Sequence, residues 1–422
     1  MAEKAKTFRE VPCPFCSLIC DDLVVSETGN SLSVVSAGCA RAKKFFERKE
    51  PSISPMVNGQ EVPLEKAIKD AAALIGESRV PLFSGSATDM AGSAELLSLA
   101  EKCNAIVDHA HGESMLSNVK VAQTHGSIMT TFAEVKNRAD TLILVGTDTR
   151  EKYPRFFERL IWNQASLAGL GKNKREIVFL GENLDTRHGK SPDGKRALNI
   201  NCSKKALNEY LSVLQAMLSD RKFEEDALPD KDLVKLKKLA RIIRSSDYGV
   251  FVWDPAELHP KAGDMTVQLI AAMTRLLNVK QRFSGLSLSG NNGANSFSSV
   301  CSWQSGFPLR VKFEKGAPRH DIKSYGTEKL IRENSNDLLL WISSFDTSLA
   351  RPRTLAPTIV LSRPSLRAAR EADVFIPVAT PGLDHEGNLV RADSAVSLRM
   401  KKLRELGLPS SADVLKAINA RL

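Results

Sequence analysis

Segments with helical periodicity alternate with short apolar runs along most of the chain. The first such pair is the helical segment LEKAIKDAAALIGES and the apolar run VPLFSG. Three more pairs follow, and they are AELLSLAEKC with AIVD, AEVKNRA with TLILVGT, and RFFERLIWNQ with REIVFLG. Apolar runs of this length are typical of buried strands. Because helices and strands that alternate at this spacing pack as parallel sheets with helices on both faces, the pattern predicts an α/β fold.

The alternation resumes after a helical stretch at 204–245. The elements predicted there are the strand YGVFVWD, the helix MTVQLIAAMTRLLN and the strands NDLLLWISSFD, PTIVLSR and ADVFIPV. We expect the last three strands to belong to one sheet edge. Ligands of such sheets bind at the carboxyl ends of the strands, but neither a GxGxxG nor a GxxxxGK[ST] motif follows these strands. The pattern therefore disfavours an ordinary nucleotide-binding fold.

The N-terminal segment has a different pattern. Between Cys20 and Cys39, apolar and polar residues alternate on both sides of Gly29-Asn30, which is typical of a β-hairpin with a tight turn. Prolines then punctuate the chain at positions 51, 55 and 63. These changes predict three lobes. They are a small Cys-rich lobe at 1–55, a discontinuous α/β lobe formed by 56–124 with 276–422, and a second α/β lobe at 125–275.

Most of the cysteines are clustered near the N-terminus, as Cys13, Cys16, Cys20 and Cys39. Their spacing is C-x2-C-x3-C followed by a fourth cysteine after eighteen residues, which is typical of a metal site in a reducing compartment. The uneven spacing favours a 4Fe–4S cluster, while a zinc ion and an empty set of buried thiols inherited from an ancestor are the alternatives. The remaining cysteines have no second ligand nearby in the sequence, so we expect small buried apolar residues there. They are Cys103, Cys202 and Cys301.

The composition is that of a globular protein, with 42% hydrophobic and 26% charged residues among 422. No apolar run approaches the roughly 18 residues that cross a bilayer, and Met1–Glu10 lacks a hydrophobic signal segment, so we expect a cytoplasmic protein without a membrane span. The 59 basic and 49 acidic residues give a net charge of +10 that is not gathered in one tail. Nucleic acid is not an expected partner, because neither a basic arm nor an aromatic-rich sheet motif accompanies this charge.

A Cys-rich start followed by two parallel-sheet lobes resembles the molybdopterin and tungstopterin oxidoreductases. Three segments narrow this resemblance to the B subunit of formylmethanofuran dehydrogenase, and they occur in the same order and with similar spacing. They are TFAEVKNRADTLILVGTD followed by YPRF, CSWQSGFPLRVKFEKGAPRH, and EADVFIPVATPGLDHEGNLVRAD. The resemblance implies a molybdopterin-oxidoreductase-like fold with a small N-terminal lobe and two α/β lobes. It also implies that the four clustered cysteines are ligands of a 4Fe–4S cluster.

One site departs from this family. In the redox enzymes, a cysteine or selenocysteine before His-Gly ligates molybdenum or tungsten, and the matching residue here is Ala110, before His111-Gly112. A methyl group cannot bind a metal. In addition, the family's Asp-Pro-Arg after a strand is matched by Gly181-Glu182-Asn183. The resemblance therefore implies that neither molybdopterin nor tungstopterin is bound.

A redox subunit without its metal resembles the B subunit of the formyltransferase/hydrolase complex of methylotrophic bacteria. That complex transfers a formyl group from formyl-tetrahydromethanopterin to an acidic methanofuran-type carrier and hydrolyses it to formate. The resemblance implies a structural subunit without a catalytic residue. Its partners would be an amidohydrolase-like subunit, a formyltransferase subunit and a C-like subunit, and it would serve one-carbon metabolism.

Two other functions remain open. The chain could be an active molybdenum or tungsten oxidoreductase in which another ligand replaces the thiolate, or an electron-transfer module for an unrelated partner. His109, His111 and His125 are candidate metal ligands, but polar residues lining a vacated cavity are the favoured interpretation. For a subunit of a stable complex we also expect an exposed apolar patch, at 303–308 and 375–381.

Overall fold

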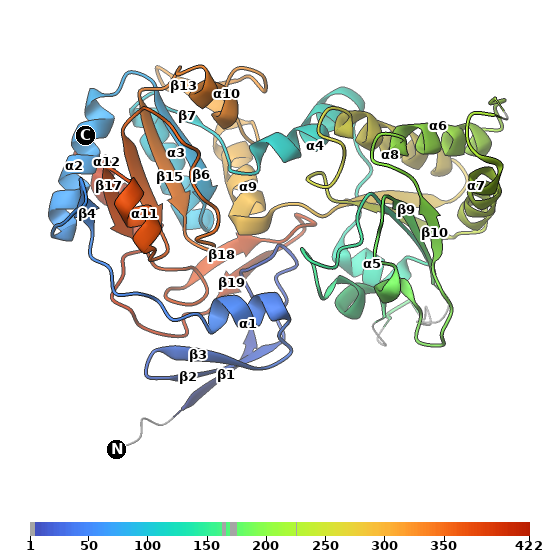
Figure 1. The fold of residues 1–422 in the computed structure, drawn as a ribbon, viewed down its shortest axis with the longest axis horizontal. Coiled ribbons are helices and arrows are strands. Elements are labelled where there is room, and N and C mark those ends of the chain that lie inside the picture. Colours follow the sequence, from blue (N-terminus) through green and yellow to red (C-terminus); the bar gives the residue numbers. More distant parts are fainter. Residues whose placement is uncertain (1–4, 163–165, 169–174, 225) are drawn as a thin grey trace. The chain divides into compact units, whose positions relative to one another are not determined.

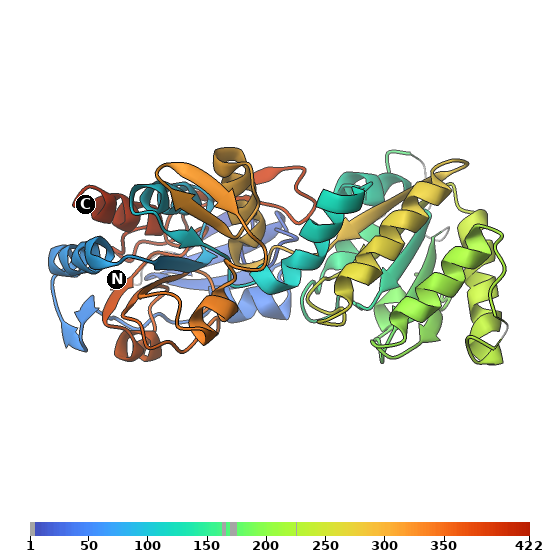
Figure 2. The same ribbon diagram turned by 90° about the horizontal axis from the view of Figure 1, so that it is seen from above.

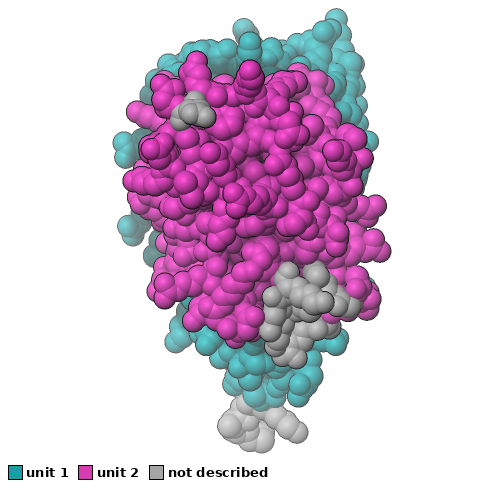
Figure 3. Space-filling model, turned by 90° about the vertical axis from the view of Figure 1, so that its right-hand side faces the viewer, with its two compact units in different colours: residues 1–113, 290–422 teal, residues 114–289 magenta. Residues whose placement is uncertain are grey.

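The structure, a computed structural model, describes residues 5–162, 166–168, 175–224 and 226–422. The chain forms two compact units, which Figure 3 shows in different colours. The first unit comprises residues 1–113 and 290–422, and the second comprises residues 114–289. The three-lobe division predicted at residues 55, 124 and 275 stays a prediction.

The first unit begins with a small antiparallel sheet and a helix (Figure 1). Its elements are β1 (Lys6–Val11), β2 (Leu23–Thr28), β3 (Ser31–Ser36) and α1 (Ala40–Phe46). Strands β2 and β3 pair as the predicted hairpin. Its two turn residues, Gly29 and Asn30, have φ angles of 54° and 63°. Positive φ at two successive positions is typical of a type I′ turn, whose twist matches that of the strands it joins.

A larger sheet forms the body of the first unit, with nine strands in the described chain in the order β14-β13-β7-β6-β15-β16-β17-β4-β5. Its five central strands are parallel, and short antiparallel strands extend both edges. The strands are β4 (Met56–Val57), β5 (Gln60–Glu61), β6 (Pro81–Ala87), β7 (Ile106–Val107), β13 (Val311–Glu314), β14 (Ala317–His320), β15 (Leu338–Ser343), β16 (Thr358–Ser362) and β17 (Val374–Pro377). The three late strands, β15 to β17, lie side by side in one sheet as expected, but their expected position at its edge is wrong, because β6 flanks β15 and β4 flanks β17.

Helices pack around this sheet, and a hairpin follows it. The helices are α2 (Leu64–Glu77), α3 (Met90–Lys102), η4 (Asn291–Gly293), α9 (Ala294–Ser305), α10 (Thr327–Arg332), α11 (Leu366–Glu371) and α12 (Ser411–Asn419). The hairpin strands are β18 (Gly387–Val390) and β19 (Ser397–Met400). Helix α4 (Gly112–His125) begins at the end of the first unit's N-terminal segment and continues in the second unit.

The second unit contains a fully parallel sheet in the order β10-β9-β8-β11-β12. The strands are β8 (Thr141–Val145), β9 (Glu176–Gly181), β10 (Leu198–Asn201), β11 (Tyr248–Trp253) and β12 (Arg282–Ser287). The helical elements are α5 (Phe132–Arg138), the π-helix η1 (Phe157–Ile161), η3 (Arg187–Gly189), α6 (Leu207–Leu218), α7 (Asp230–Arg244) and α8 (Gly263–Leu277). Figure 2 shows α6, α7 and α8 from above. No helix in the described ranges is long and apolar enough to cross a membrane.

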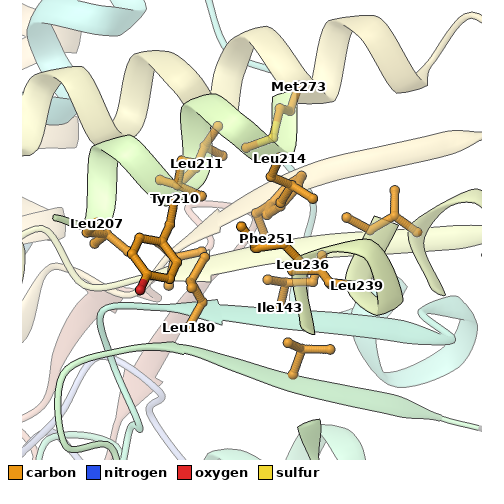
Figure 4. Close-up of a cluster of buried hydrophobic side chains, with 14 of the residues drawn as sticks. Ile143, Leu180, Leu207, Tyr210, Leu211, Leu214, Leu236, Leu239, Phe251 and Met273 are labelled. Carbon is orange, nitrogen blue, oxygen red and sulfur yellow. The ribbon is translucent and has the colours of Figure 1, made fainter. Parts of the chain in front are cut away.

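The core of the second unit lies between its sheet and helices α6, α7 and α8 (Figure 4). Ile143, Leu180 and Phe251 contribute from three strands, and each is fully buried. Leu214 and Leu236 contribute from two of the helices and are equally buried. Burial of one such side chain contributes about 1.5–3 kcal/mol. The helical periodicity of the sequence therefore corresponds to real packing against the sheet.

The exposed apolar patch that we expected is wrong for one of its two segments. Trp303 on α9 is 65% exposed, but Phe375 and Ile376 on β17 are fully buried. Strand β17 pairs with β16 on one side and with β4 on the other, so its apolar side chains belong to the core. A run of apolar residues in a parallel strand is buried on both faces, and such a strand offers no surface to a partner.

Candidate functional site

The loop after β1 places three cysteines close together. The backbone N–H of Cys13 donates to the carbonyl of Cys20 at 2.8 Å, and the N–H of Ile19 donates to the carbonyl of Cys16 at 3.1 Å. All three cysteines are at most 7% exposed. The C-x2-C-x3-C spacing therefore folds into a tight, buried turn.

The fourth cysteine approaches from the beginning of α1. Cys39 is the N-cap of this helix, and its sulfur accepts a hydrogen bond from the backbone N–H of Ala42 at 3.4 Å. In the first turn of the same helix, the Arg41 guanidinium donates to the carbonyl of Phe15 at 2.5 Å. The carbonyl of Phe15 lies in the cysteine loop, so this bond ties α1 to the loop.

The thiols of these cysteines influence one another electrostatically. Burial raises the pKa of the Cys13 thiol well above its usual range, and the neighbouring Cys16, Cys20 and Cys39 raise it further. Burial likewise raises the pKa of Cys16 to about 11, and nearby Arg41 partly opposes this shift. Like-charge effects of this kind require short separations. The four cysteines are therefore neighbours, and without a metal Cys13 and Cys16 are protonated at neutral pH.

The four thiols are neighbours, but this alone does not show that they bind a metal. In the described ranges, no three His, Cys, Asp or Glu side chains are arranged to hold a metal ion. Four thiolates are nevertheless the donor set that iron–sulfur clusters and structural zinc use. The Cys-rich N-terminus is compatible with an iron–sulfur cluster, and the assignment of Cys13, Cys16, Cys20 and Cys39 as ligands stays a prediction.

The second candidate site follows strand β7, where the chain runs through Asp108 to Gly112 into α4. The backbone N–H of Ala110 donates to the carbonyl of Gly85 at 3.2 Å, and that of Asp108 donates to the carbonyl of Phe83 at 3.0 Å. The half-buried methyl group of Ala110 packs against the apolar core of the first unit. This position therefore offers an apolar contact and no donor atom.

Each histidine beside Ala110 has a ring nitrogen in a polar contact, while the buried Nε2 of His109 has no hydrogen-bond partner among the described residues. His109 is 1% exposed, and its Nδ1 accepts the backbone N–H of His111 at 2.9 Å. The Nε2 of His111 lies 3.2 Å from the side-chain amide of Asn292. Burial lowers the pKa of His109 well below its usual range, and His111 lowers it further. His109 is therefore a neutral imidazole held in place by its neighbours.

His125 does not join the other two histidines in a ligand set. Its ring nitrogens lie 2.7 Å from the hydroxyl of Thr124 and 3.0 Å from the amide of Gln268. Within the described part of the chain, none of the three histidines belongs to a group of side chains that could hold a metal ion. With Ala110 carrying a methyl group, the residues at this site do not fit the metal of the redox enzymes, and we derive no chemistry through it.

A buried ion pair lies at the segment from Asp108 to Gly112. No pattern in the sequence predicted it. The Asp108 carboxylate accepts hydrogen bonds from the backbone N–H of Thr327 at 2.9 Å and from its hydroxyl at 3.0 Å. Arg310 lies 3.5 Å from the same carboxylate, and its guanidinium also contacts Glu113 at 2.6 Å. Burial raises the pKa of Asp108, although Arg310 opposes the shift. A Cβ atom at Gly326 would lie 2.8 Å from the guanidinium carbon of Arg310, so a larger residue there would displace this side chain.

A cavity of about 190 Å³ with both polar and apolar lining residues borders this network. Its lining includes Asp108, His109, Ala110, Arg310 and Trp341. A typical pocket for a drug-sized ligand has about 300–1,000 Å³, so this cavity fits waters or a very small polar molecule. Among its lining residues, the hydroxyl of Thr327 donates to the carboxylate of Asp108.

The loop that matches the family's Asp-Pro-Arg follows β9 in the second unit. The backbone N–H of Asn183 donates to the side chain of Asn201 at 2.9 Å, and Glu182 accepts from the backbone N–H of Lys204 at 3.3 Å. These hydrogen bonds connect the loop to the end of β10 and to the turn before α6. Glu182 and Asn183 therefore stabilise the local fold of this loop.

No protein-family model matches the chain. The chain is 23% identical over 420 residues to the B subunit of the tungsten-containing formylmethanofuran dehydrogenase 2 of Methanocaldococcus jannaschii, and the match covers 94% of each protein. It is 22% identical over 437 residues to the corresponding protein of Methanococcus maripaludis, covering 98% of each. It is 27% identical over 337 residues to the B subunit of the formyltransferase/hydrolase complex Fhc of Methylorubrum extorquens, covering 79% of this chain and 87% of that protein.

Two solved structures have the same fold. A chain of the formyltransferase/hydrolase complex from Methylorubrum extorquens, crystallised with methylofuran, matches with a TM-score of 0.74 and 25% identity. This match covers 87% of the present chain and 98% of the solved one. Acetylene hydratase from Pelobacter acetylenicus matches with a TM-score of 0.66 at 10% identity, which bears on the fold alone. The predicted molybdopterin-oxidoreductase-like α/β fold is confirmed.

Proposed function

We propose that this chain, a homologue of the B subunits of formylmethanofuran dehydrogenase and of the formyltransferase/hydrolase complex, is the B subunit of a formyltransferase/hydrolase complex. Such a complex converts formyl-tetrahydromethanopterin to formate through a formylated methanofuran-type carrier. The proposal is supported by the match to a chain of the solved complex, which covers 98% of that chain.

The observation that carries this proposal is the residue at position 110. Ala110 has no donor atom, and the neighbouring His109 and His111 are engaged by a backbone N–H and by Asn292. Replacing a soft thiolate by a methyl group removes the protein's bond to the metal. A subunit of this fold with alanine at this position has no thiolate there to bind a metal that would oxidise or reduce a formyl group.

We therefore assign this subunit a structural, non-catalytic role. Formyl transfer and hydrolysis belong to its partners, an amidohydrolase-like subunit and a formyltransferase subunit, together with a C-like subunit. The acidic methanofuran-type carrier moves between those partners. The contribution of this chain is the set of surfaces that it offers to them, of which the exposed Trp303 on α9 is one candidate anchor.

We further propose that Cys13, Cys16, Cys20 and Cys39 hold a 4Fe–4S cluster. The support is their spacing, their burial and the mutual effect of their charges on the pKa of Cys13. Arg41, whose charge favours the ionised form of Cys16, would compensate part of the negative charge of such a cluster. When bound, a cluster supplies one-electron redox chemistry and a cross-link between the loop and α1.

An active molybdenum or tungsten oxidoreductase is the alternative. The observation that favours it is the match to tungsten-containing enzymes, which extends over 94% and 98% of the chain. The match to the formyltransferase/hydrolase complex has the higher identity but covers 79% of the chain. The absence of a donor atom at Ala110 decides our preference for the non-redox complex.

Purification of the native complex separates the two functions. The proposed function predicts co-purification with formyltransferase and amidohydrolase-like subunits, formate release from formyl-tetrahydromethanopterin, and no molybdenum, tungsten or pterin. Stoichiometric molybdenum or tungsten with bound pterin, together with formate-linked reduction of a dye, would reject it in favour of the oxidoreductase. Iron and acid-labile sulfide in the same preparation test the cluster independently.

A further inference from the structure

The cavity beside Ala110 has an excess of negative charge. Its charged lining residues are three carboxylates and one guanidinium, which are those of Asp108, Glu113, Glu328 and Arg310. Their formal charges therefore sum to −2, and all four residues belong to the first unit. Because charges interact strongly in a partly enclosed cavity, a cation there would balance this excess and an anion would increase it.

Arg310 alone does not neutralise these carboxylates. Its guanidinium is shared between Asp108 at 3.5 Å and Glu113 at 2.6 Å, and it also donates to the carbonyl of Ile322. The Oδ1 atom of Asp108 is buried and has no hydrogen-bond partner among the described residues. Glu328 is exposed and forms no ion pair within the described part of the chain. The single positive charge is therefore shared, and the negative excess remains.

A second arginine close by in the sequence does not change this balance. Arg351 lies between Ala350 and Pro352, which both line the cavity, but Arg351 itself is not one of the lining residues. Its guanidinium donates to the carbonyl of Pro352 at 3.2 Å and to that of Glu371, and its side chain lines a different pocket. The charge of Arg351 is therefore held outside the cavity.

The uncharged part of the lining favours an organic cation over a metal ion. Its apolar residues are Ala110, Trp341, Leu349, Ala350 and Pro352. In the described ranges, no three His, Cys, Asp or Glu side chains are arranged to hold a metal ion. Apolar groups cannot replace the oxygen ligands of a hard metal ion, but they can contact the carbon atoms of an alkylammonium ion. The indole N–H of Trp341 donates to the carbonyl of Leu349 at 3.3 Å, and an indole ring also attracts a cation that lies over its face.

The volume of the cavity limits the size of such a cation. At about 190 Å³ it is smaller than a pocket for a drug-sized molecule, so the ligand has only a few carbon atoms. Two of the carboxylates, those of Glu113 and Glu328, are exposed and can accept from the three N–H donors of an ammonium group. We propose that this cavity binds a small primary alkylammonium ion, with the ammonium group at Glu113 and Glu328 and the carbon chain against the apolar residues. This inference goes beyond the proposed function and does not rest on it.

Calorimetric titration of the purified full-length chain with propylammonium chloride tests this site. Propan-1-ol and sodium propionate have nearly the same size as propylammonium but a different charge, so they separate recognition of charge from filling of an apolar cavity. The test variant combines Glu113→Gln and Glu328→Gln, which remove both exposed carboxylates. The matched control combines Glu314→Gln and Glu333→Gln, which remove the same charge from the first unit outside the cavity, and in which Glu314, like Glu113, is paired with an arginine. Circular dichroism and thermal melting establish that the variants are folded.

We expect the wild-type chain to bind propylammonium at least tenfold more tightly than propan-1-ol or propionate. The test variant should lose at least tenfold in affinity for propylammonium, and the control should lose less than threefold. If the double variant does not fold, Glu328→Gln alone removes an exposed, unpaired carboxylate and should weaken binding about threefold. Equal losses in the test and control variants would mean that the overall charge of the first unit, and not the cavity, attracts the cation. The proposal is also overturned if the wild-type chain does not bind propylammonium, or if it binds propan-1-ol or propionate as tightly.

Discussion

At the residue scale, the side chain of Arg310 stabilises the buried polar network around Asp108. It is 5% exposed and neutralises the buried Asp108. Removal of one partner of a buried pair leaves an uncompensated charge, so we expect Arg310→Met to lower the free energy of unfolding by about 3–5 kcal/mol. Arg319→Met is the control, because Arg319 forms an exposed pair with Glu314 and its loss costs at most about 1 kcal/mol. Urea denaturation measures both, and equal losses would contradict the assigned role of Arg310.

His109 makes the stability of the protein depend on pH. Because burial lowers the pKa of His109 below that of the unfolded chain, the folded state binds fewer protons, and stability falls as the pH drops below about 6.5. The fall is at most about 1.4 kcal/mol for each pH unit from this one group. In His109→Asn the side-chain oxygen replaces the Nδ1 acceptor and does not titrate. Urea denaturation at pH 7 and pH 5 should show a smaller difference for the variant, and an unchanged difference would exclude His109 as the cause.

Helix α1 has two roles at the scale of an element, as part of the packing and as the support for Cys39. Loss of an N-cap costs about 1 kcal/mol, and serine replaces a cap where alanine does not. We therefore expect Cys39→Ala, but not Cys39→Ser, to destabilise the metal-free chain. After reconstitution with iron and sulfide, both variants should lack the absorbance near 400 nm that a cluster gives to the wild type. Retention of that absorbance in either variant would remove Cys39 from the ligand set.

For the whole molecule, the proposed function depends on Ala110, which has a methyl group where the resemblance to the redox enzymes implies a metal-binding thiol or selenol. Ala110→Cys restores one thiol but not the other groups that hold a pterin, such as the residues replaced by Glu182 and Asn183. We expect this variant to show no formate-linked reduction of a dye acceptor, and to release formate from formyl-tetrahydromethanopterin at the wild-type rate when assembled with its partners. Dye reduction by the variant would show that the pterin-binding groups are still present.

Local patterns predicted the features that depend on neighbouring residues in the sequence. The α/β alternation, the hairpin with its turn at Gly29 and Asn30, and the parallel order of β15 to β17 all follow from side-chain periodicity and turn chemistry. Strand β12 was not predicted, because its sequence RFSGLS mixes polar and small residues with apolar ones. It is a strand because it pairs with β11 along its whole length.

The sequence by itself determined the α/β class, the cluster of four cysteines and the missing donor at Ala110, since each depends on residue identity or on spacing along the chain. Only the tertiary structure decided which residues meet across long separations. Arg310 and Glu113 are 197 positions apart, and the burial of Phe375 depends on the two strands that flank β17. Contacts of this kind are properties of packing, and no local pattern encodes them.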